Sequence, residues 1–224
     1  MQTRRYHCYV DSALLCADVA RRIVELANQS IDQSGRFRIV LAGGNTPQVI
    51  YQQLCQADTD WSAWQVFYGD ERCLPVGDTQ RNDHMAELSW LSHVAISADQ
   101  IYAIPAELGA EAGAQEYAQN LADIDDFNLV LLGLGEDGHT ASLFPGHEHP
   151  RGTKAVAVSG SPKPPAQRVS LSTEMLGSSE QVWFIVTGEG KRQALSQWQQ
   201  GAAIPASLVQ PAAGVDIFTD LNVC

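Results

Sequence analysis

Short apolar runs alternate along this chain with longer segments of helical periodicity. The clearest pair is the run at residues 37–41 followed by a helical pattern through Val49, Ile50 and Leu54, and the most apolar run covers residues 127–132. Runs that are apolar on both faces predict strands covered on two sides, and strands that alternate with helices predict a mainly parallel sheet. The sequence therefore predicts a doubly wound, Rossmann-like α/β fold with helices on both faces.

The same alternation places the remaining elements. We expect further strands at residues 66–68, 101–104, 155–158, 168–171, 182–187 and 215–218, helices at 13–27, 110–121 and 191–198, and a helix opening at Asn82. Thr46 is placed to cap the helix after the first run, with Pro47 in its first position. The proline-rich residues 159–167 are expected to form a surface loop.

Composition indicates one domain and a reduced compartment. No repeat or compositional break divides the 224 residues, so we expect a single domain over residues 1–224. No run approaches the roughly 20 apolar residues that span a bilayer, and residues 1–10 lack the apolar stretch of a signal peptide. Because the five cysteines are scattered and odd in number, we expect the chain in the cytoplasm.

The charge balance restricts the partners. Fourteen basic and 26 acidic residues give a net charge of -12, which repels nucleic acid and anionic membranes at long range. We therefore expect neither partner. An anionic small molecule would need cations and backbone N–H groups gathered locally, so the sparse Arg and Lys residues are informative.

Polar, glycine-rich segments follow three of the predicted strands, where an open α/β sheet binds its ligand. In the first, Gly43, Gly44, Asn45 and Thr46 let backbone N–H groups and a helix N-terminus approach a phosphate. An ordinary capped turn is the alternative interpretation. The second segment is Tyr68-Gly69-Asp70-Glu71-Arg72.

The third segment carries a candidate general base. Asp137 and His139 flank Gly138, a spacing at which the carboxylate can orient the imidazole while the chain bends. A purely structural histidine is the alternative. Arg168 and Lys191 begin a strand and a helix, and each is either a phosphate ligand or a solvated cation.

Three other features carry weaker signals. His147 and His149 lack further metal ligands at suitable spacing, so a polar loop is favoured. Cys73 adjoins Arg72 but has no dedicated base beside it, so we do not expect a catalytic nucleophile there. The chain contains no serine-hydrolase elbow, Walker loop or dinucleotide fingerprint.

The motifs LAGGNTP, GDERCLP, GLGEDGHTASLFPG, KPPAQRVSLS and TGEGKRQAL resemble those of the 6-phosphogluconolactonases, within the group that includes glucosamine-6-phosphate deaminase. They run from Leu41 to Leu195 in the family's order. The deaminases typically carry a DEY-like second motif and follow DGH with Ile-Ala-Phe-Asn, so DER and DGHTASLF favour the lactonase branch. Asn45 departs from the pattern, because serine is commoner there.

The resemblance implies a role for each candidate residue. The phosphate would be held by the turn of Gly43, Gly44, Asn45 and Thr46, with positive charge from Arg168 and Lys191. The substrate would also contact Asp70 and Arg72. His139, oriented by Asp137, would activate a water that opens 6-phospho-D-glucono-1,5-lactone in the pentose phosphate pathway. The Gly138 N–H or the Arg72 guanidinium would stabilise the oxyanion.

The resemblance also implies a simple set of partners. It predicts no metal and no organic cofactor, a small sugar-phosphate lactone as substrate, and a monomer or small homo-oligomer. Two alternatives remain: a glucosamine-6-phosphate deaminase, and a non-catalytic sugar-phosphate effector domain. The second would be expected to carry a basic face and a DNA-binding helix pair, which this acidic sequence lacks.

Overall fold

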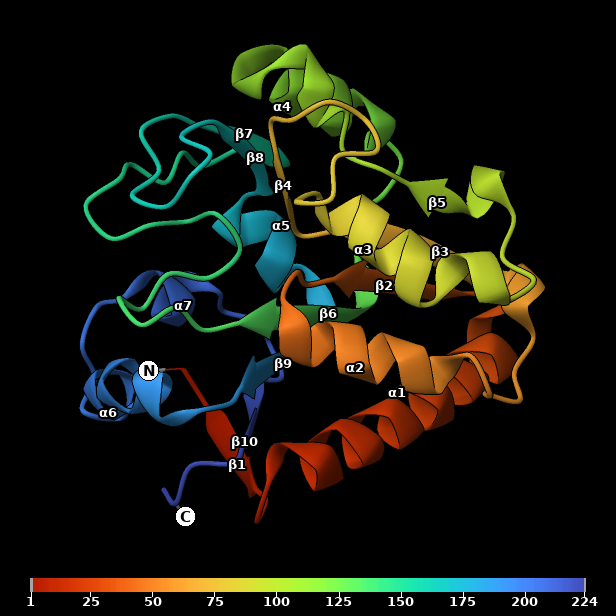
Figure 1. Cartoon of the computed structure of the whole chain (residues 1–224), viewed down its shortest axis with the longest axis horizontal. Helices are drawn as coiled ribbons and strands as arrows, with labels where there is room; N and C mark the ends of the chain where they lie inside the picture. Colours follow the sequence, from red (N-terminus) through yellow and green to blue (C-terminus); the bar gives the residue numbers. More distant parts are fainter. Residues whose placement is uncertain (1, 224) are drawn as a thin grey trace.

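A computed structural model describes residues 2–223, and its centre is a parallel sheet (Figure 1). Seven strands of the described chain form this sheet in the order β1-β10-β9-β6-β2-β3-β5. Their bounds are β1 (Arg4–Cys8), β2 (Phe37–Leu41), β3 (Trp64–Tyr68), β5 (Ile101–Tyr102), β6 (Phe127–Gly133), β9 (Ser179–Val186) and β10 (Val215–Thr219). Every neighbouring pair is parallel, which confirms the predicted class of sheet.

Helices cover both faces of the sheet, as predicted. On β9, Phe184 packs edge-on against Trp198 of α6, whereas its neighbour Trp183 packs against Phe218, which lies beneath Arg22 of α1. Successive residues of a strand point to opposite faces, so α1 and α6 lie on opposite sides. The α-helices are α1 (Ser12–Ser34), α2 (Asn45–Leu54), α3 (Asn82–Ser89), α4 (Ala110–Asn120), α5 (Thr173–Gly177), α6 (Arg192–Gln199) and α7 (Pro205–Leu208).

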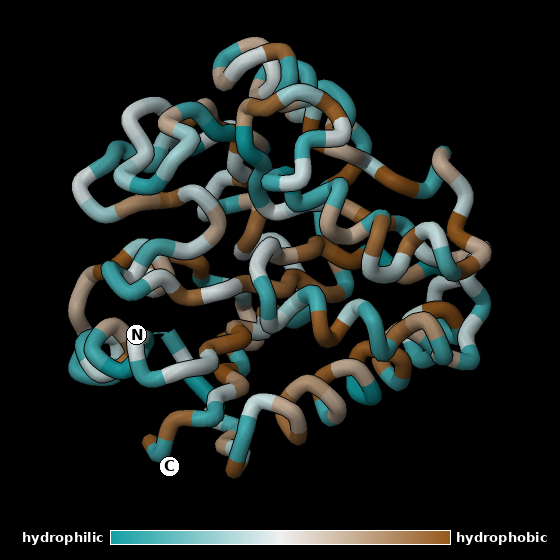
Figure 2. Tube along the Cα trace, viewed as in Figure 1, coloured by the Kyte–Doolittle hydropathy of each residue, from teal (hydrophilic) through white to brown (hydrophobic). Residues whose placement is uncertain are grey.

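The apolar residues gather between these layers, as the hydropathy colouring of the trace shows (Figure 2). Phe37, Val66 and Leu129, on three adjacent strands, are fully buried. Short 3-10 turns connect several elements: η1 (Trp61–Ala63), η2 (Leu91–His93), η3 (Ala98–Gln100), η4 (Ala106–Leu108) and η5 (Glu189–Lys191). Within residues 2–223, the helices include none with the length and apolar character needed to cross a membrane.

A second, smaller sheet is the main feature that periodicity did not predict. The strands β4 (Asp70–Arg72), β7 (Ala155–Val158) and β8 (Arg168–Leu171) pair antiparallel in the order β4-β8-β7. Two of them coincide with predicted strands but lie outside the parallel sheet. Because β4 follows β3 after a single residue, Gly69, this small sheet projects beyond the end of the main one.

Three predicted boundaries are corrected. The first helix continues beyond residue 27 to Ser34 and ends at Gly35, whose φ of 74° suits glycine. Thr46 does not cap α2: Gly44 is the cap residue, and the Thr46 hydroxyl bonds the Thr187 hydroxyl at 2.7 Å. Lys191 ends a 3-10 turn, and α6 itself begins at Arg192.

The strand order creates a topological switch point between β2 and β6. From β2 the chain builds outward through β3 to β5, whereas from β6 it builds in the other direction through β9 to β10. The loops after β2 and β6 therefore leave neighbouring strands toward opposite sides, which opens a crevice between them. These loops contain two of the three predicted glycine-rich segments.

Candidate active site

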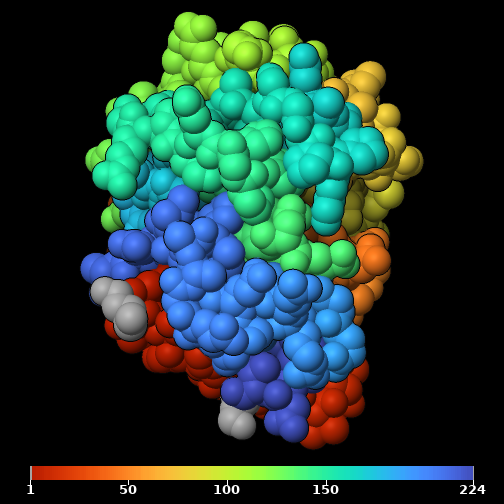
Figure 3. Space-filling model, turned by 90° about the vertical axis from the view of Figure 1, so that its left-hand side faces the viewer, coloured from red at the N-terminus to blue at the C-terminus, as the bar shows by residue number. Residues whose placement is uncertain are grey.

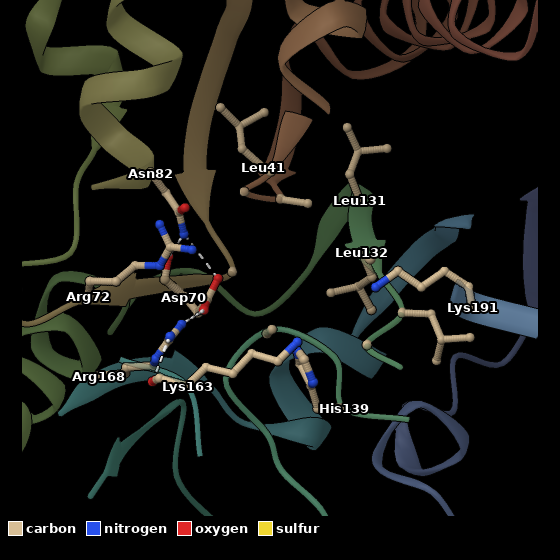
Figure 4. Close-up of a pocket in the computed structure, with 18 residues that line it drawn as sticks. Leu41, Asp70, Arg72, Asn82, Leu131, Leu132, His139, Lys163, Arg168 and Lys191 are labelled. Atoms are coloured by element: carbon tan, nitrogen blue, oxygen red, sulfur yellow. Dashed lines mark hydrogen bonds and ion pairs between the residues drawn. The ribbon is translucent and has the colours of Figure 1, made fainter. Parts of the chain in front are cut away.

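A cavity of about 250 Å³ occupies this switch point (Figure 4). Its walls come from the ends of β2, β3 and β6, the loop after β6, strands β4 and β8, the start of α3, and the segments before β8 and α6. They include Gly43, Gly44, Asp70, Arg72, Asn82, Gly135, His139, Lys163, Arg168 and Lys191. On the outer surface, the segment that follows β6 (green) lies between the segment preceding β8 (teal) and the α6 region (blue) (Figure 3). Distant parts of the sequence thus meet here.

The cavity is cationic in a chain of net charge -12. Its lining includes the cations Arg72, Lys163, Arg168 and Lys191 against one carboxylate, Asp70. Lys191 enters from the side opposite Arg72 and Arg168, and Lys163 extends toward His139 (Figure 4). The local excess of positive charge suits an anionic ligand such as a phosphate ester.

His139 is held by Asp137 and turned toward the cavity. Its Nδ1 lies 2.5 Å from Asp137 Oδ1, which also accepts the His139 backbone N–H at 3.1 Å. Because a carboxylate only accepts hydrogen bonds, Nδ1 carries the hydrogen and Nε2 keeps its lone pair. The tight turn requires Gly135: a Cβ there would lie 2.0 Å from His139 Nδ1. Asp137 and Gly138 lie behind the histidine, outside the cavity lining.

The surroundings favour a neutral imidazole and an ionised carboxylate. Burial lowers the pKa of His139 below 6.5 and outweighs the opposing effect of Asp137. Burial acts to raise the pKa of Asp137, but hydrogen bonds from the ring and backbone N–H of His139 lower it overall. A neutral imidazole with a free Nε2 can accept a proton near neutral pH.

Asp70 links several walls of the cavity. Its carboxylate accepts hydrogen bonds from Asn82 Nδ2 at 3.1 Å and from Ser142 Oγ at 2.5 Å, and it lies 3.9 Å from Arg168 Nη1. It is almost completely buried. A fixed carboxylate of this kind can accept a hydrogen bond from a sugar hydroxyl.

The two arginines of the cavity differ in how many of their guanidinium nitrogens donate hydrogen bonds to the protein. Arg168 donates from Nε to Pro165 O and from Nη2 to the carbonyls of Lys163 and Pro164, at 3.1–3.3 Å, so it also holds the loop before β8. Arg72 donates to Gln80 O, but its buried Nε has no partner among the described residues. That unpaired donor favours a ligand contact, because buried polar groups normally have partners.

The glycine turn after β2 supplies backbone donors. Among the described residues no side chain caps α2, so the N–H groups at its start, which have no acceptor within the helix, also lack a side-chain acceptor. Gly43 is required for close packing, since a Cβ there would lie 2.1 Å from Asn82 Oδ1. Gly43 and Gly44 line the cavity, whereas Asn45 and Thr46 do not. Asn45 lines a neighbouring hollow between α2 and α3.

Sequence reasoning missed Lys163 and Asn82 as site residues. Lys163 belongs to the KPPAQR motif, in a loop predicted only as exposed, and a lysine beside a proline pair was the available signal. Asn82 was recognised as a helix start. Its side chain instead faces Asp70 and Gly43 across the cavity wall.

The weaker candidates remain weak. Among residues 2–223, no cluster of three or more His, Cys, Asp or Glu side chains is arranged to hold a metal ion. Burial raises the pKa of the Cys73 thiol, which disfavours the reactive thiolate. Neither feature adds a function to the cavity described above.

Fold and cavity together define an α/β protein with a cationic pocket and an aspartate-held histidine at its switch point. The family model described as glucosamine-6-phosphate isomerases/6-phosphogluconolactonase matches residues 10–218. The chain therefore belongs to this family, as its motifs predicted.

Individual relatives agree with this assignment. The chain is 33% identical to a 6-phosphogluconolactonase of Streptomyces coelicolor, over 91% of this chain and 85% of the relative. It is 35% identical to a 6-phosphogluconolactonase of Mycobacterium tuberculosis, over 92% and 89%. A solved 6-phosphogluconolactonase from Thermotoga maritima shares the fold with a TM-score of 0.91 at 24% identity, covering 97% of this chain and 99% of that one.

Proposed function

We propose that this chain hydrolyses 6-phospho-D-glucono-1,5-lactone to 6-phospho-D-gluconate, in the oxidative branch of the pentose phosphate pathway. The observation that carries the proposal is His139, whose Nδ1 is held by Asp137 while Nε2 faces a cationic cavity. Relatives named 6-phosphogluconolactonase support the substrate class. The acting species is a monomer or small homo-oligomer in the cytoplasm.

The phosphate of the substrate is anchored first. Lys191 and Arg168 supply positive charge from opposite sides of the cavity, and the N–H groups at Gly43 and Gly44 supply backbone donors. The Arg72 guanidinium then contacts the sugar or its phosphate, and the Asp70 carboxylate accepts a hydrogen bond from a sugar hydroxyl. Anchoring at several points converts the attack of water into a reaction between fixed partners.

His139 next moves the proton. Nε2 takes a proton from a water whose oxygen bonds to the lactone carbonyl carbon, and the carbonyl becomes an oxyanion. When the ester bond breaks, the ring oxygen leaves and receives that proton from His139. Asp137 keeps the lone pair aimed at the water and stabilises the imidazolium formed in between.

Oxyanion stabilisation falls to donors already at the site. The Arg72 guanidinium lines the cavity, whereas the Gly138 N–H, the other candidate, donates to Gly135 O at 3.0 Å and lies outside the cavity lining. We therefore favour Arg72, because a donor already at the cavity can act without rearrangement, which is the condition for effective electrostatic catalysis. The proposed chemistry uses only these protein groups and water, with no metal ion or organic cofactor.

The reaction is tested with the purified chain and freshly prepared lactone. We expect opening well above the spontaneous rate, and no ammonia release from glucosamine 6-phosphate. Ammonia release without lactone opening would replace the proposal with the deaminase reaction. Binding of 6-phosphogluconate without turnover of either substrate would replace it with an effector domain.

A further inference from the structure

We propose that Glu71 is a positioning residue for this reaction, holding the Gly43 turn and Asp70 in place through Asn82. The inference rests on the proposed function and deepens it. Glu71 is absent from the cavity lining, so it would act without touching the substrate.

Glu71 fixes the point where α3 begins. Its carboxylate is 1% exposed, and Oε1 accepts the backbone N–H groups of Asn82 at 2.7 Å and Arg72 at 2.9 Å. Oε2 accepts the N–H of Asp83 at 2.8 Å. Two of these donors belong to the first turn of α3, whose N–H groups have no partner within the helix. One buried side chain therefore ties β4 to the start of α3.

Asn82 carries that constraint into the cavity. It is 4% exposed, and its Nδ2 donates to Asp70 O at 2.8 Å and to Asp70 Oδ1 at 3.1 Å. On its other side the same amide fills the space in which a Gly43 Cβ would lie. The Asn82 side chain thus sits between two of the proposed substrate contacts, and its backbone is held by Glu71.

Asp70 extends the connection to the remaining walls. Its other oxygen accepts the Ser142 hydroxyl at 2.5 Å and lies 3.9 Å from Arg168 Nη1. Ser142 follows His139 by three residues, so the chain of contacts reaches the segment carrying the base. Glu71, Asn82 and Asp70 together join the turn after β2, strand β4 and the segment that follows β6.

A carboxylate in this position is costly, which argues for a role beyond filling space. Removing a charge from water is unfavourable, and burial raises the pKa of Glu71 to about 7. Arg81 Nε lies 4.0 Å away as the nearest opposite charge. The amide of glutamine would occupy the same volume without the charge, but it would turn a donor toward one of the three N–H groups. Only a carboxylate accepts all three.

The test compares E71Q, N82A and the double variant with wild type. We expect each single variant to raise KM for the lactone about tenfold to a hundredfold, because small misplacements of anchoring groups have effects of this size. If Glu71 acts through Asn82, the KM of the double variant should lie within about threefold of the higher KM of the two single variants, since the effects of coupled residues are non-additive. The matched control is D216N, the same acid-to-amide change at a buried site on β10, paired with Arg5 and His7.

The split between KM and kcat separates positioning from stability. A purely structural role would reduce the folded fraction, which lowers the apparent kcat and leaves KM unchanged. D216N is expected to keep the wild-type KM even where its melting temperature falls. Any of three results would overturn the proposal. They are a wild-type KM in E71Q, increases of KM that multiply in the double variant, and an equal increase of KM in D216N.

Two further outcomes are also decisive. If E71Q does not fold, N82A decides alone: a raised KM supports the positioning role and a wild-type KM overturns it. If the wild-type chain does not open the lactone, the proposed function fails. Positioning is then measured by calorimetry with 6-phosphogluconate, whose affinity E71Q and N82A should weaken by about tenfold or more, and unchanged affinity would overturn it.

Discussion

Two histidine–aspartate pairs lie within residues 2–223, and the histidine of one of them, His139, lines the cavity at the switch point. At the switch point, His139 Nδ1 bonds Asp137 and the ring borders the cationic pocket. At the far edge of the sheet, His7 Nε2 bonds Asp216 at 2.8 Å, and the ring stacks on Phe218 with centroids 4.5 Å apart.

The difference lies in what else each pair contacts. Asp216 also binds Arg5 through two nitrogens, so its charge is already matched, and the pair ties β1 to β10. Asp137 has His139 as its partner, through both ring and backbone. A hydrogen-bonded histidine is therefore a candidate base only where its second nitrogen reaches a space that holds water and substrate.

The largest expected contrast is between H139N and H7N. Loss of a general base should lower kcat by a factor on the order of 10² to 10⁴, and H7N should stay within about twofold of wild type. Initial rates of lactone opening, corrected for spontaneous hydrolysis, measure both. An equal decrease of kcat in the two variants would contradict the proposal that only the His139–Asp137 pair takes part in catalysis.

Substitution of the two aspartates should show the same contrast in kcat, with a smaller effect than substitution of the histidines. D137N keeps the shape of the pair but no longer holds the required tautomer, so we expect kcat to fall about a hundredfold. D216N should lower the melting temperature and leave kcat unchanged, because its contacts join strands away from the cavity. Activity loss in D216N at constant folded fraction would contradict this assignment.

The cations of the cavity should affect binding more than chemistry. K191A is expected to raise KM about tenfold, with kcat within about threefold of wild type, since a phosphate contact is lost in ground and transition states alike. K154A is the matched control, because Lys154 donates to the carbonyls of Leu121, Ala122 and Ile124 outside the cavity. A fall in kcat alone for K191A would argue against an anchoring role.

The smallest expected effect is on the pH dependence. His139 must be neutral to accept a proton, and burial lowers its pKa from 6.5. We therefore expect kcat/KM to be constant above the lowered pKa of His139 and to decrease as the pH falls through it. Asp137 raises the pKa of His139, and D137N should therefore move this acid limb to lower pH. A shift to higher pH would contradict the proposed electrostatics, as measured from pH profiles of both proteins.

Much of the fold followed from the sequence, because apolar periodicity reports burial directly. The runs that became β2 and β6 are buried on both faces of the sheet. By contrast, β1 was missed: it is an edge strand with the sequence RRYHC, whose partly exposed faces leave no continuous apolar run. Strand β4 covers three residues and depends on pairing with β8, which no local pattern encodes.

The candidate site was predictable where a motif directly follows a strand. Gly43, Asp70 and His139 were identified in this way, because the carboxyl ends of parallel strands meet at one edge. Lys163 and Asn82 were not, because their positions depend on tertiary contacts. Arg168 holds the backbone at Lys163, and Glu71 fixes the start of α3 at Asn82.

The general-base role of His139 is tested most directly by chemical rescue of H139A. Lactone opening is measured with and without added imidazole, and each rate is corrected for the same buffer lacking protein. We expect H139A to be nearly inactive and to regain activity in proportion to the concentration of neutral imidazole, which takes the place of the missing ring. H139A that retains wild-type kcat without imidazole would contradict the role.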